Sequence, residues 1–342
     1  MKRLIMAVIL LCTIVLIVPT VLVHVVSGPS EDIVPMQATT PHVEEKQVNK
    51  PYNPEKDVTV SVFRSKTEQI EHVPLERYVI GVVASEMPAE FEMEALKAQS
   101  LTARTYIIKQ MLHPGDIQLP DDAMVTDSVM HQVYHNEDEL KALWGADYER
   151  KMARIEEAVL STQGKVLTFE GEPITASFFS TSNGYTENSE DYWQNEIPYL
   201  RSVASPWDQS SPRFTSEKAV PITEFEQKLG VTVADNSSVG TIAKRTDGGR
   251  VAKVNINGKE LSGREVRDKL ELDSSDFQWQ RQGDQVMIQT RGWGHGVGMS
   301  QYGADGMAKE GKNYQEIVRH YYRGIDIQAL DPYVAELTAR NE

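Results

Sequence analysis

A glycine-rich run near the C-terminal end constrains this chain more than any other feature. Residues 291–303 read RGWGHGVGMSQYG, with a glycine at every second position from Gly292 to Gly298. Glycine in a strand costs backbone entropy and packs nothing, so an ordinary strand does not explain this pattern. The pattern predicts positive φ angles and close backbone approach to a ligand or another segment. The run leads into a helix predicted over Met299–Lys309, where free N–H groups point outward. We interpret it as part of a binding site; a buried tight turn is the alternative.

The N-terminus predicts membrane attachment. Lys2 and Arg3 precede a mostly apolar run from Leu4 to Val26, and about 20 such residues span a bilayer. The flanking positive charge places residues 1–3 in the cytoplasm and everything after Ser27 outside it. A cleaved signal peptide is the alternative, but the apolar run is too long and lacks a clear small-x-small cleavage site. We therefore expect an uncleaved, single-pass anchor at residues 4–26 and an extracytoplasmic domain.

Composition narrows the classes of function. The chain has 342 residues, a formal net charge of −15 and one cysteine, Cys12, inside the predicted anchor. The exported part therefore has no disulfide and no thiolate chemistry. Nucleic-acid binding needs clustered Lys and Arg, which argues against a general nucleic-acid role. Any anionic substrate must instead be met by local basic groups.

The remaining sequence predicts one mixed α+β catalytic domain at residues 58–335. It is preceded by a Pro-rich flexible linker at residues 27–57, and residues 221–288 are a candidate inserted subdomain. Alternating valines from Val58 and a second short strand at Glu68–Val73 predict a hairpin. The later elements are a helix at Glu137–Gln163, paired strands at Lys165–Phe169 and Ile174–Phe179, an aromatic-rich loop at Tyr185–Asp208, and closing helices at Met299–Lys309 and Tyr314–Tyr322.

Glu86 is the first candidate catalyst. Pro74 opens a helix that must end near Glu86, because Pro88 disfavours the α region at Met87. The negative end of the helix dipole disfavours a carboxylate there and raises its pKa. A carboxyl group with a raised pKa suits a general acid that protonates a leaving oxygen. The alternative is a solvated residue at a helix end.

A second helix, predicted over Glu92–Met111, carries basic side chains on one face. Lys97, Ser100 and Arg104 are spaced i, i+3 and i+7, and the small residues around them predict a buried helix. Buried cations are costly unless they meet anions. The basic face therefore either forms ion pairs with nearby glutamates or binds a substrate carboxylate.

Two kinds of histidine stand out. His131 and His135 have the i, i+4 spacing of a metal pair if their segment is helical, but the intervening residues favour an extended chain and HExxH is absent. His295, in the glycine-rich run, is the better functional histidine, as a hydrogen-bonding group or a proton shuttle. Several serines, including Ser300, are nucleophiles only in principle, because no Ser–His–Asp spacing is present.

Aromatic residues gather in the loop before residue 208. Rings next to amide and acid groups suit sugar faces and hydroxyls, and a plain core explains them equally well. The residues concerned are Tyr185, Tyr192, Trp193, Tyr199 and Trp207, together with Asn183, Asn188 and Asp208.

Four motifs together give the chain a specific resemblance. They are VPLERYVIGVVASEMPAEFEMEALKAQSLTARTY (73–106), SFFSTSNGYTENSEDYW (177–193), YLRSVASPWD (199–208) and GWGHGVGMSQYGADGMA (292–308). From about Val58 to Gly324 the chain resembles the family of stage II sporulation protein D and amidase enhancers. The predicted anchor and linker match the membrane topology of that family.

The resemblance implies a peptidoglycan lytic transglycosylase that acts on glycan strands during septal wall remodelling and engulfment of the forespore. It implies Glu86 as the catalytic acid/base. The predicted substrate-binding residues are Lys97, Ser100, Arg104, Tyr199, Asp208, His295, Ser300 and Gln301. The implied partners are an amidase, stage II sporulation protein P, and a membrane protein, stage II sporulation protein M.

The resemblance also bears on metals and on substrate choice. Some members bind zinc through cysteines and histidines near Thr126–Gln132, but this chain has His131 and no cysteine there, so we predict no metal and no cofactor. We further expect Lys97 and Arg104 to bind the lactyl carboxylate of peptide-free muramic acid. A non-catalytic, wall-binding enhancer of an amidase is the runner-up, and a zinc hydrolase is a third interpretation.

Overall fold

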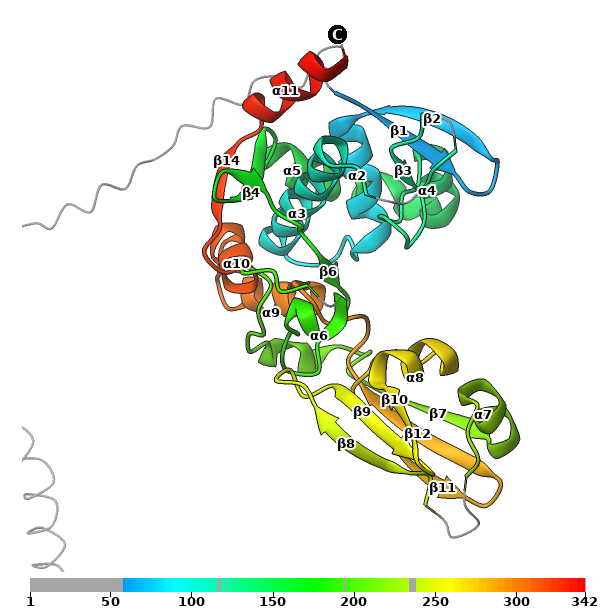
Figure 1. The fold of residues 1–342 in the computed structure, drawn as a ribbon. Helices are drawn as coiled ribbons and strands as arrows, with labels where there is room; N and C mark the ends of the chain where they lie inside the picture. Colours follow the sequence, from blue (N-terminus) through cyan, green and yellow to red (C-terminus); the bar gives the residue numbers. More distant parts are fainter. Residues whose placement is uncertain (1–57, 116–117, 121, 194, 234–237, 342) are drawn as a thin grey trace, which may run out of the picture. The chain divides into compact units, whose positions relative to one another are not determined.

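The computed structural model describes residues 58–115, 118–120, 122–193, 195–233 and 238–341, which form a mixed α+β fold (Figure 1). This confirms the predicted mixed α+β class. The predicted anchor at residues 4–26 and linker at residues 27–57 lie outside the described residues. None of the helices in those described ranges is long and apolar enough to cross a membrane.

The described chain begins with the predicted hairpin. Strands β1 (Thr59–Arg64) and β2 (Gln69–Pro74) pair antiparallel, with Thr59 opposite Pro74. The short strand β3 (Val125–Thr126) adds to β1 in parallel. The inward side chains of β1 lie in a core that also includes the next two helices.

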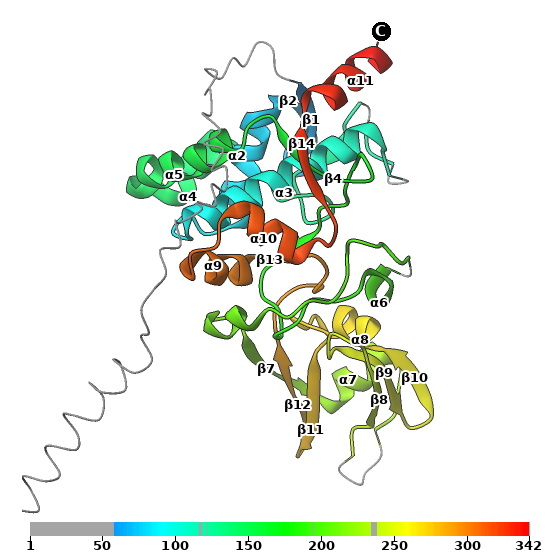
Figure 2. The same ribbon diagram turned by 90° about the vertical axis from the view of Figure 1, so that its left-hand side faces the viewer.

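Helix α2 (Leu75–Glu86) ends where the sequence predicts. Pro74 is its N-cap, and Met87 leaves the helix with φ −127° and ψ 137°, the extended conformation that a residue before proline prefers. Helix α3 (Met93–Leu112) follows and is buried over most of its length, as its small residues predict. It packs between α2 and α5 (Tyr148–Ser161) on one side and α9 (Gln301–Lys309) and α10 (Tyr314–Tyr321) on the other (Figure 2).

The helix predicted over residues 137–163 is interrupted. Helix α4 (Glu137–Trp144) stops at Gly145, which has a positive φ of 51°, and a 3-10 turn, Gly145–Asp147, connects it to α5. Glycine is the residue that adopts this backbone conformation without steric cost, so the chain turns there.

The strand pairing predicted around Glu170–Gly171 is only partly right. Strand β4 (Lys165–Phe169) pairs with the short β5 (Glu172–Pro173) and, on its other edge, with β14 (Asp326–Ala329). Strand β6 (Phe178–Phe179) instead pairs in parallel with β13 (Met299–Ser300). The helix predicted from Met299 therefore begins two residues later, at Gln301. This pairing across about 120 residues is a tertiary contact with no local sequence signal.

The segment predicted as an aromatic-rich loop holds two short helices, α6 (Ser189–Trp193) and a 3-10 helix at Pro206–Ser210. The C-terminal part continues after α10 with β14 and α11 (Asp331–Asn341).

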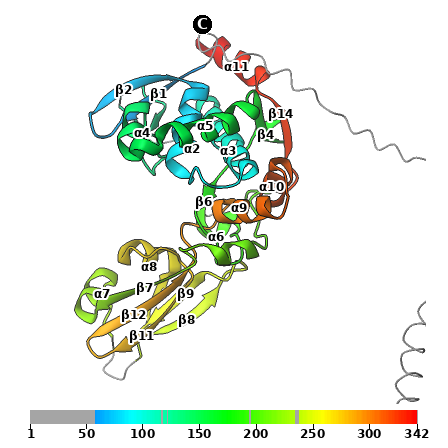
Figure 3. The same ribbon diagram turned by 180° about the vertical axis from the view of Figure 1, so that it is seen from behind.

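Residues 215–291 form a group of strands and helices that follow one another along the chain (Figure 3). Their buried apolar side chains form a hydrophobic cluster of their own. One three-stranded sheet has the order β11-β12-β7 and the other β10-β9-β8. The elements are β7 (Thr215–Pro221), α7 (Ile222–Leu229), β8 (Thr241–Arg245), β9 (Val251–Ile256), β10 (Lys259–Ser262), α8 (Gly263–Leu270), β11 (Phe277–Gln282) and β12 (Gln285–Arg291). Strand β12 ends at Arg291, where the glycine-rich run begins.

Candidate active site

Glu86 is partly buried at the C-terminal end of α2. Its Oε1 accepts a hydrogen bond from the backbone N–H of Val133 at 2.8 Å. Burial raises the pKa of Glu86, and the Val133 hydrogen bond opposes this rise without cancelling it. Removal of the carboxyl group from water is the main cause of this rise, whereas the sequence suggested the helix dipole.

Glu86 lines a cleft of about 620 Å³. Two other predicted site residues, His295 and Gln301, line the same cleft. The sequence reasoning missed several more, namely Trp144, Lys151, Arg213 and Tyr302. Trp293, from the glycine-rich run, is also there, and its ring lies 4.5 Å from the guanidinium carbon of Arg213. The cleft thus combines one partly buried acid, aromatic rings and two cations.

The glycine-rich run closely approaches other backbone, as predicted. Gly292, Gly294, Gly296 and Gly298 all have positive φ, between 81° and 112°. At Gly298 a Cβ would lie 2.0 Å from the carbonyl oxygen of Ser177. Trp293 exchanges two backbone hydrogen bonds with Thr181, at 2.7 and 3.0 Å. Glycine is required because the run lies directly against the segment that follows β5.

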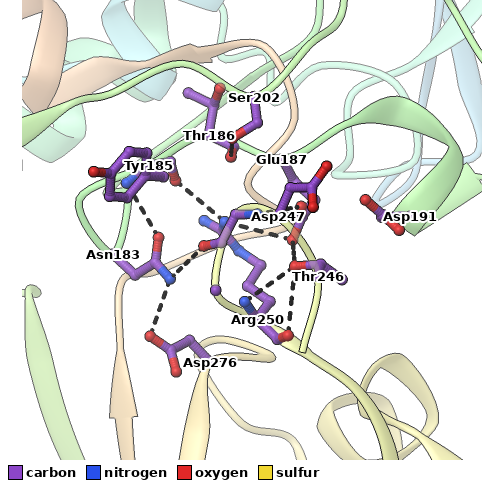
Figure 4. Close-up of polar contacts among 12 residues, drawn as sticks. Asn183, Tyr185, Thr186, Glu187, Asp191, Ser202, Thr246, Asp247, Arg250 and Asp276 are labelled. Carbon is purple, nitrogen blue, oxygen red and sulfur yellow. Dashed lines mark hydrogen bonds and ion pairs between the residues drawn. The ribbon is translucent and has the colours of Figure 1, made fainter. Parts of the chain in front are cut away.

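A buried ion pair between Arg250 and Glu187, drawn in Figure 4, lies against this run at Gly296. Arg250 and Glu187 are each 2% exposed and lie 3.7 Å apart. Glu187 also accepts from Thr246 Oγ1 at 2.8 Å, and Arg250 donates to the carbonyl of Tyr185 at 3.1 Å. A Cβ on Gly296 would lie 2.3 Å from the guanidinium carbon of Arg250. The network joins the turn before β9 to the site.

His295 is a neutral hydrogen-bonding residue. Its Nε2 lies 3.0 Å from the carbonyl oxygen of Phe178, which only accepts, so Nε2 carries the proton. Its Nδ1 accepts from the N–H of Val297 at 3.1 Å. Burial, followed by the charge of Arg267, lowers the pKa of His295 to about 4. Both nitrogens are engaged with backbone, and this geometry favours the hydrogen-bonding role of His295 over the proton shuttle.

Gln301 connects the two segments of the cleft that carry Glu86 and the glycine-rich run. It is the first residue of α9, and its Nε2 donates to the backbone carbonyl of Glu86 at 3.0 Å. It therefore holds the end of α2 against the end of the glycine-rich run.

Asp208 and Ser300 lie beneath the cleft, not on its surface. Both are fully buried. Asp208 accepts hydrogen bonds from the hydroxyls of Ser182, Ser205 and Ser300 and from the N–H of Ser182, at 2.5–2.8 Å. Burial raises its pKa against these hydrogen bonds. Neither side chain lines the cleft, and both anchor the start of α9, so their direct contact with substrate stays a prediction.

The basic face of α3 also differs from the prediction. Arg104 is fully buried and forms a bidentate pair with Glu76, at 2.7 and 2.8 Å. Its remaining donors bind the carbonyls of Val159 and Thr162. Lys97 pairs with Glu94 at 2.7 Å. The ion-pair alternative therefore describes both cations, and neither lines the cleft.

Two further predicted contacts are internal. Ser100 is fully buried and donates to the carbonyl of Leu96 at 2.7 Å. Tyr199 is buried, and its hydroxyl accepts from the N–H of Thr175 at 2.8 Å. Helical spacing placed Ser100 on a shared face with the two cations, but that face packs largely against other elements, and of the three side chains Lys97 alone is partly exposed, at 22%.

Most of the loop aromatics pack internally. Tyr192 and Trp193 pack at a tilt against the His295 ring, with ring centroids 5.6 and 5.7 Å from its centroid. Trp207 packs edge-on against His320. Tyr185 is the exposed member, at 53%. None of the five loop aromatics lines the cleft, whose indoles are Trp144 and Trp293.

The segment with His131 and His135 is not helical. The Nδ1 of His131 contacts Thr126, whereas the Nδ1 of His135 contacts Ser85 Oγ at 2.8 Å. Among the described residues no group of three or more His, Cys, Asp or Glu side chains is placed to hold a metal ion. The residues present therefore do not fit the zinc set of the zinc-binding family members.

Fold and site together define a mixed α+β protein with an acid in a cleft of indoles and cations. A family model described as Stage II sporulation protein matches residues 63–169. The chain is 48% identical to stage II sporulation protein D of Bacillus amyloliquefaciens over 333 residues, which are 96% of this chain and 97% of that protein. It is also 48% identical to the protein of that name from Bacillus subtilis (strain 168) over 342 residues, 99% and 100% of the two chains.

A more distant relative is the amidase enhancer of Bacillus subtilis (strain 168). It is 27% identical over 306 residues, which are 72% of this chain and 40% of that protein. On the strength of the two relatives at 48% identity, this chain belongs to the stage II sporulation protein D family and is a sporulation protein.

Proposed function

We propose that this protein is a membrane-anchored lytic transglycosylase. Its substrate would be peptide-free peptidoglycan, cleaved between N-acetylmuramic acid and N-acetylglucosamine with formation of a 1,6-anhydro ring. The observation that supports this most is the position of Glu86, a carboxyl group with a raised pKa in a cleft lined by aromatic rings. Such a group remains protonated to higher pH than an ordinary glutamate and suits general-acid catalysis.

A single glutamate suffices for this reaction. Glu86 donates its proton to the glycosidic oxygen as the bond to the anomeric carbon breaks. The carboxylate then takes the proton of the sugar's own 6-hydroxyl, whose oxygen attacks the anomeric carbon. Glu86 is protonated again at the end, and no water is consumed. The intramolecular attack benefits from proximity.

Glu90 is the other carboxylate that lines the cleft among the described residues. It lies 3.4 Å from both Arg150 and Lys151. Burial raises the pKa of Glu90, but a backbone hydrogen bond and these two cations outweigh it and lower the pKa overall. An ordinary glycosidase uses two carboxylates, so Glu90 is the residue that a hydrolytic mechanism would require.

The cations available to a sugar carboxylate are different from those predicted. Lys97 and Arg104 are paired within the protein and do not line the cleft. Arg213 and Lys151 line it, and Lys151 is paired there with Glu90. Arg213 is exposed, and within the described ranges its guanidinium contacts the Trp293 ring without an acidic partner. We assign recognition of the lactyl carboxylate in the cleft to Arg213.

The apolar run at residues 4–26 supports a single-pass location in the cell membrane, with the described domain outside the cytoplasm at the septum. Stage II sporulation proteins P and M are the proposed partners, and the peptidoglycan glycan strand is the proposed substrate.

The test compares the full chain in detergent with its Glu86→Gln and Glu90→Gln variants on peptide-stripped glycan. Mass spectrometry distinguishes 1,6-anhydro ends from reducing ends. We expect anhydro ends from the wild type and from Glu90→Gln, and none from Glu86→Gln. Reducing ends that depend on both glutamates would replace the proposal with a two-carboxylate hydrolase.

A second candidate function follows from the amidase enhancer relative. In that case the cleft binds glycan without cleaving it and the protein stimulates an amidase. Glu86→Gln would then leave stimulation of the amidase intact, and the wild type would release no new glycan ends.

A further inference from the structure

A second polar pocket, of about 630 Å³, lies on the sheet β11-β12-β7. The register separates the two faces of this sheet. Val220, Val286 and Ile288 belong to the core on one face. Side chains of the opposite face line the pocket, including Glu217, Gln278 and Gln289. Alternation along each strand thus exposes a polar surface with no role in the cleft chemistry.

Two arginines share one buried carboxylate in this pocket. Asp276, whose side chain is 3% exposed, accepts from Arg245 Nη1 at 2.7 Å and lies 3.2 Å from Arg291 Nε. It also accepts from Asn183 Nδ2 at 3.0 Å (Figure 4). The carboxylate therefore holds both guanidinium groups in place, and its charge balances only one of them.

The two arginines differ in how many of their guanidinium nitrogens remain free to donate to a ligand. Arg245 uses its terminal nitrogens on Asp276 and on the carbonyls of Gly249 and Phe277. Arg291 uses only Nε, and its side chain is 59% exposed. Within the described ranges its two terminal nitrogens have no partner. They form a planar pair of donors, which matches a carboxylate in bidentate geometry.

The rest of the pocket wall suits a sugar more than a simple anion. Gln278 and Gln289 present amide groups, and their side chains bond to each other at 2.8 Å. Glu217 lies opposite Gln289 in the register and supplies acceptors for hydroxyl or amide N–H groups. The pocket therefore offers one carboxylate-binding fork in a wall that otherwise presents two amide side chains and the carboxylate of Glu217.

Residues that line this pocket and residues that line the cleft are close neighbours in the sequence. Arg291 pairs with Thr215 at the end of the sheet. Two residues beyond Arg291 is Trp293, and two residues before Thr215 is Arg213, both of which line the cleft. The two segments are tied by a hydrogen bond from the N–H of Gly292 to the carbonyl of Phe214, at 2.8 Å.

We propose that the pocket around Arg291 is a distal subsite for the same glycan strand that occupies the cleft, and that Arg291 binds the carboxylate of a muramic acid residue outside the cleavage site. This rests on the proposed function, because it takes the glycan strand as the ligand. It also defines the chemistry of the ligand: an N-acetylated sugar that carries a free carboxylate, repeated along a chain.

The test measures binding by the full chain in detergent with Glu86→Gln, which prevents cleavage. The ligands are peptide-stripped glycan strands of one repeat and of many repeats, and chitin oligomers of equal length, which lack the carboxylate. Arg291→Gln is compared with Arg291→Lys, which keeps the charge but loses the fork. Arg281→Gln is the matched control: it removes the same charge near the far end of the same hairpin, where Arg281 Nε binds the carbonyl of Gly283.

We expect Arg291→Gln to weaken binding of long muramic strands about tenfold, the size expected for loss of a charge-assisted hydrogen bond. Arg291→Lys should lose less, and Arg281→Gln should not differ from the parent. Chitin oligomers should show no effect of Arg291→Gln. Thermal unfolding of each variant checks that the exposed substitution leaves the fold intact.

Two results would overturn the subsite, and they are distinguishable from failure of the proposed function. Equal affinities of Arg291→Gln and Arg281→Gln for long strands would contradict the proposed subsite. Cleavage by the wild type would not be affected by that result. An equal loss on chitin and on muramic strands would show that Arg291 does not bind a carboxylate. If glycan of no length is bound or cleaved, the proposed function and the subsite fail together.

Discussion

Gln301 donates a hydrogen bond to the backbone carbonyl of Glu86, a residue 215 positions earlier in the chain. This contact joins the last residue of α2 to the first residue of α9. It satisfies a carbonyl at a helix end, where no intrahelical partner exists. The cleft depends on it because the candidate acid and the glycine-rich run approach one another there.

Removal of this contact should impair the site more than the fold. We expect Gln301→Ala to lower the free energy of unfolding by about 1 kcal/mol, the usual loss for one hydrogen bond. We also expect it to lower kcat, because the carboxyl group of Glu86 is then no longer held in position by α9. Glycan cleavage and urea unfolding measure the two effects. Gln315→Ala, on the nearby helix α10, is the control and should change neither. Equal kcat for the wild type and Gln301→Ala would show that Glu86 needs no positioning from α9.

Glu86 should link activity and stability to pH. Burial raises its pKa in the folded state above that in the unfolded chain. Between the pKa of Glu86 in the unfolded chain and its higher pKa in the folded protein, the folded protein holds a proton that the unfolded chain has lost. The free energy of unfolding therefore falls as pH rises from the first pKa to the second. Cleavage should fall over the same interval, because the acid form is needed.

In Glu86→Gln the acceptor for the Val133 N–H remains while the charge is absent. We expect this variant to be at least as stable as the wild type at pH 7 and to lack that part of the pH dependence. Its activity should drop by a factor of about 100 or more, typical of a lost general acid. Urea unfolding between pH 4 and 8 tests the first point. A variant that is much less stable at pH 7 would contradict the proposed cost of burying the carboxylate.

The Arg104–Glu76 pair should behave as a structural element. We expect Arg104→Gln to cost about 3–5 kcal/mol, because it leaves a buried carboxylate without its partner. The exposed pair of Arg77 and Glu156 provides the control, and Arg77→Gln should cost less than about 1 kcal/mol. Chemical unfolding measures both. A stable Arg104→Gln protein that has lost only its affinity for glycan would restore the original substrate-binding assignment.

Gly298 tests the requirement for close backbone approach. Gly298→Ala combines a positive φ of 82° with a Cβ placed 2.0 Å from the carbonyl oxygen of Ser177. Gly311→Ala shares the positive φ, at 86°, but meets nothing within 4 Å. We expect the Gly311 variant to lose about 1 kcal/mol from backbone strain alone and the Gly298 variant to lose clearly more. Similar losses in thermal unfolding would mean that the contact with Ser177 adjusts easily.

His295 should remain neutral throughout the physiological range. Its folded pKa of about 4 lies below that of an unfolded histidine, so the unfolded chain takes up a proton first as pH falls. His295 therefore stabilises the fold fully above the unfolded pKa, and this contribution is lost as pH falls toward 4. An NMR titration should show no protonation of His295 between pH 5.5 and 8. A midpoint within that range would reinstate it as a proton shuttle.

Local signals predicted some parts of the site well. Pro88 ends α2 at Glu86 because the restriction it places on Met87 involves only neighbouring atoms. The alternating glycines likewise predicted positive φ angles, which are a property of single residues. By contrast, helical spacing grouped Lys97 with Arg104 on one face but did not say what packs there. The structure places Glu76 against Arg104 and leaves Arg213, which no spacing connects to Glu86, beside the cleft.

The sequence by itself determined the α+β class, the family, the end of α2 at Glu86 and the need for glycine at Gly298, since each depends on neighbouring residues or on a motif as a whole. Only the tertiary structure decided which charges meet the cleft and which neutralise one another inside. Burial and pairing arise between segments far apart in the chain, such as β6 with β13 or Glu86 with Gln301. A carboxylate and a cation become partners through the packing of their helices, and no local pattern records that packing.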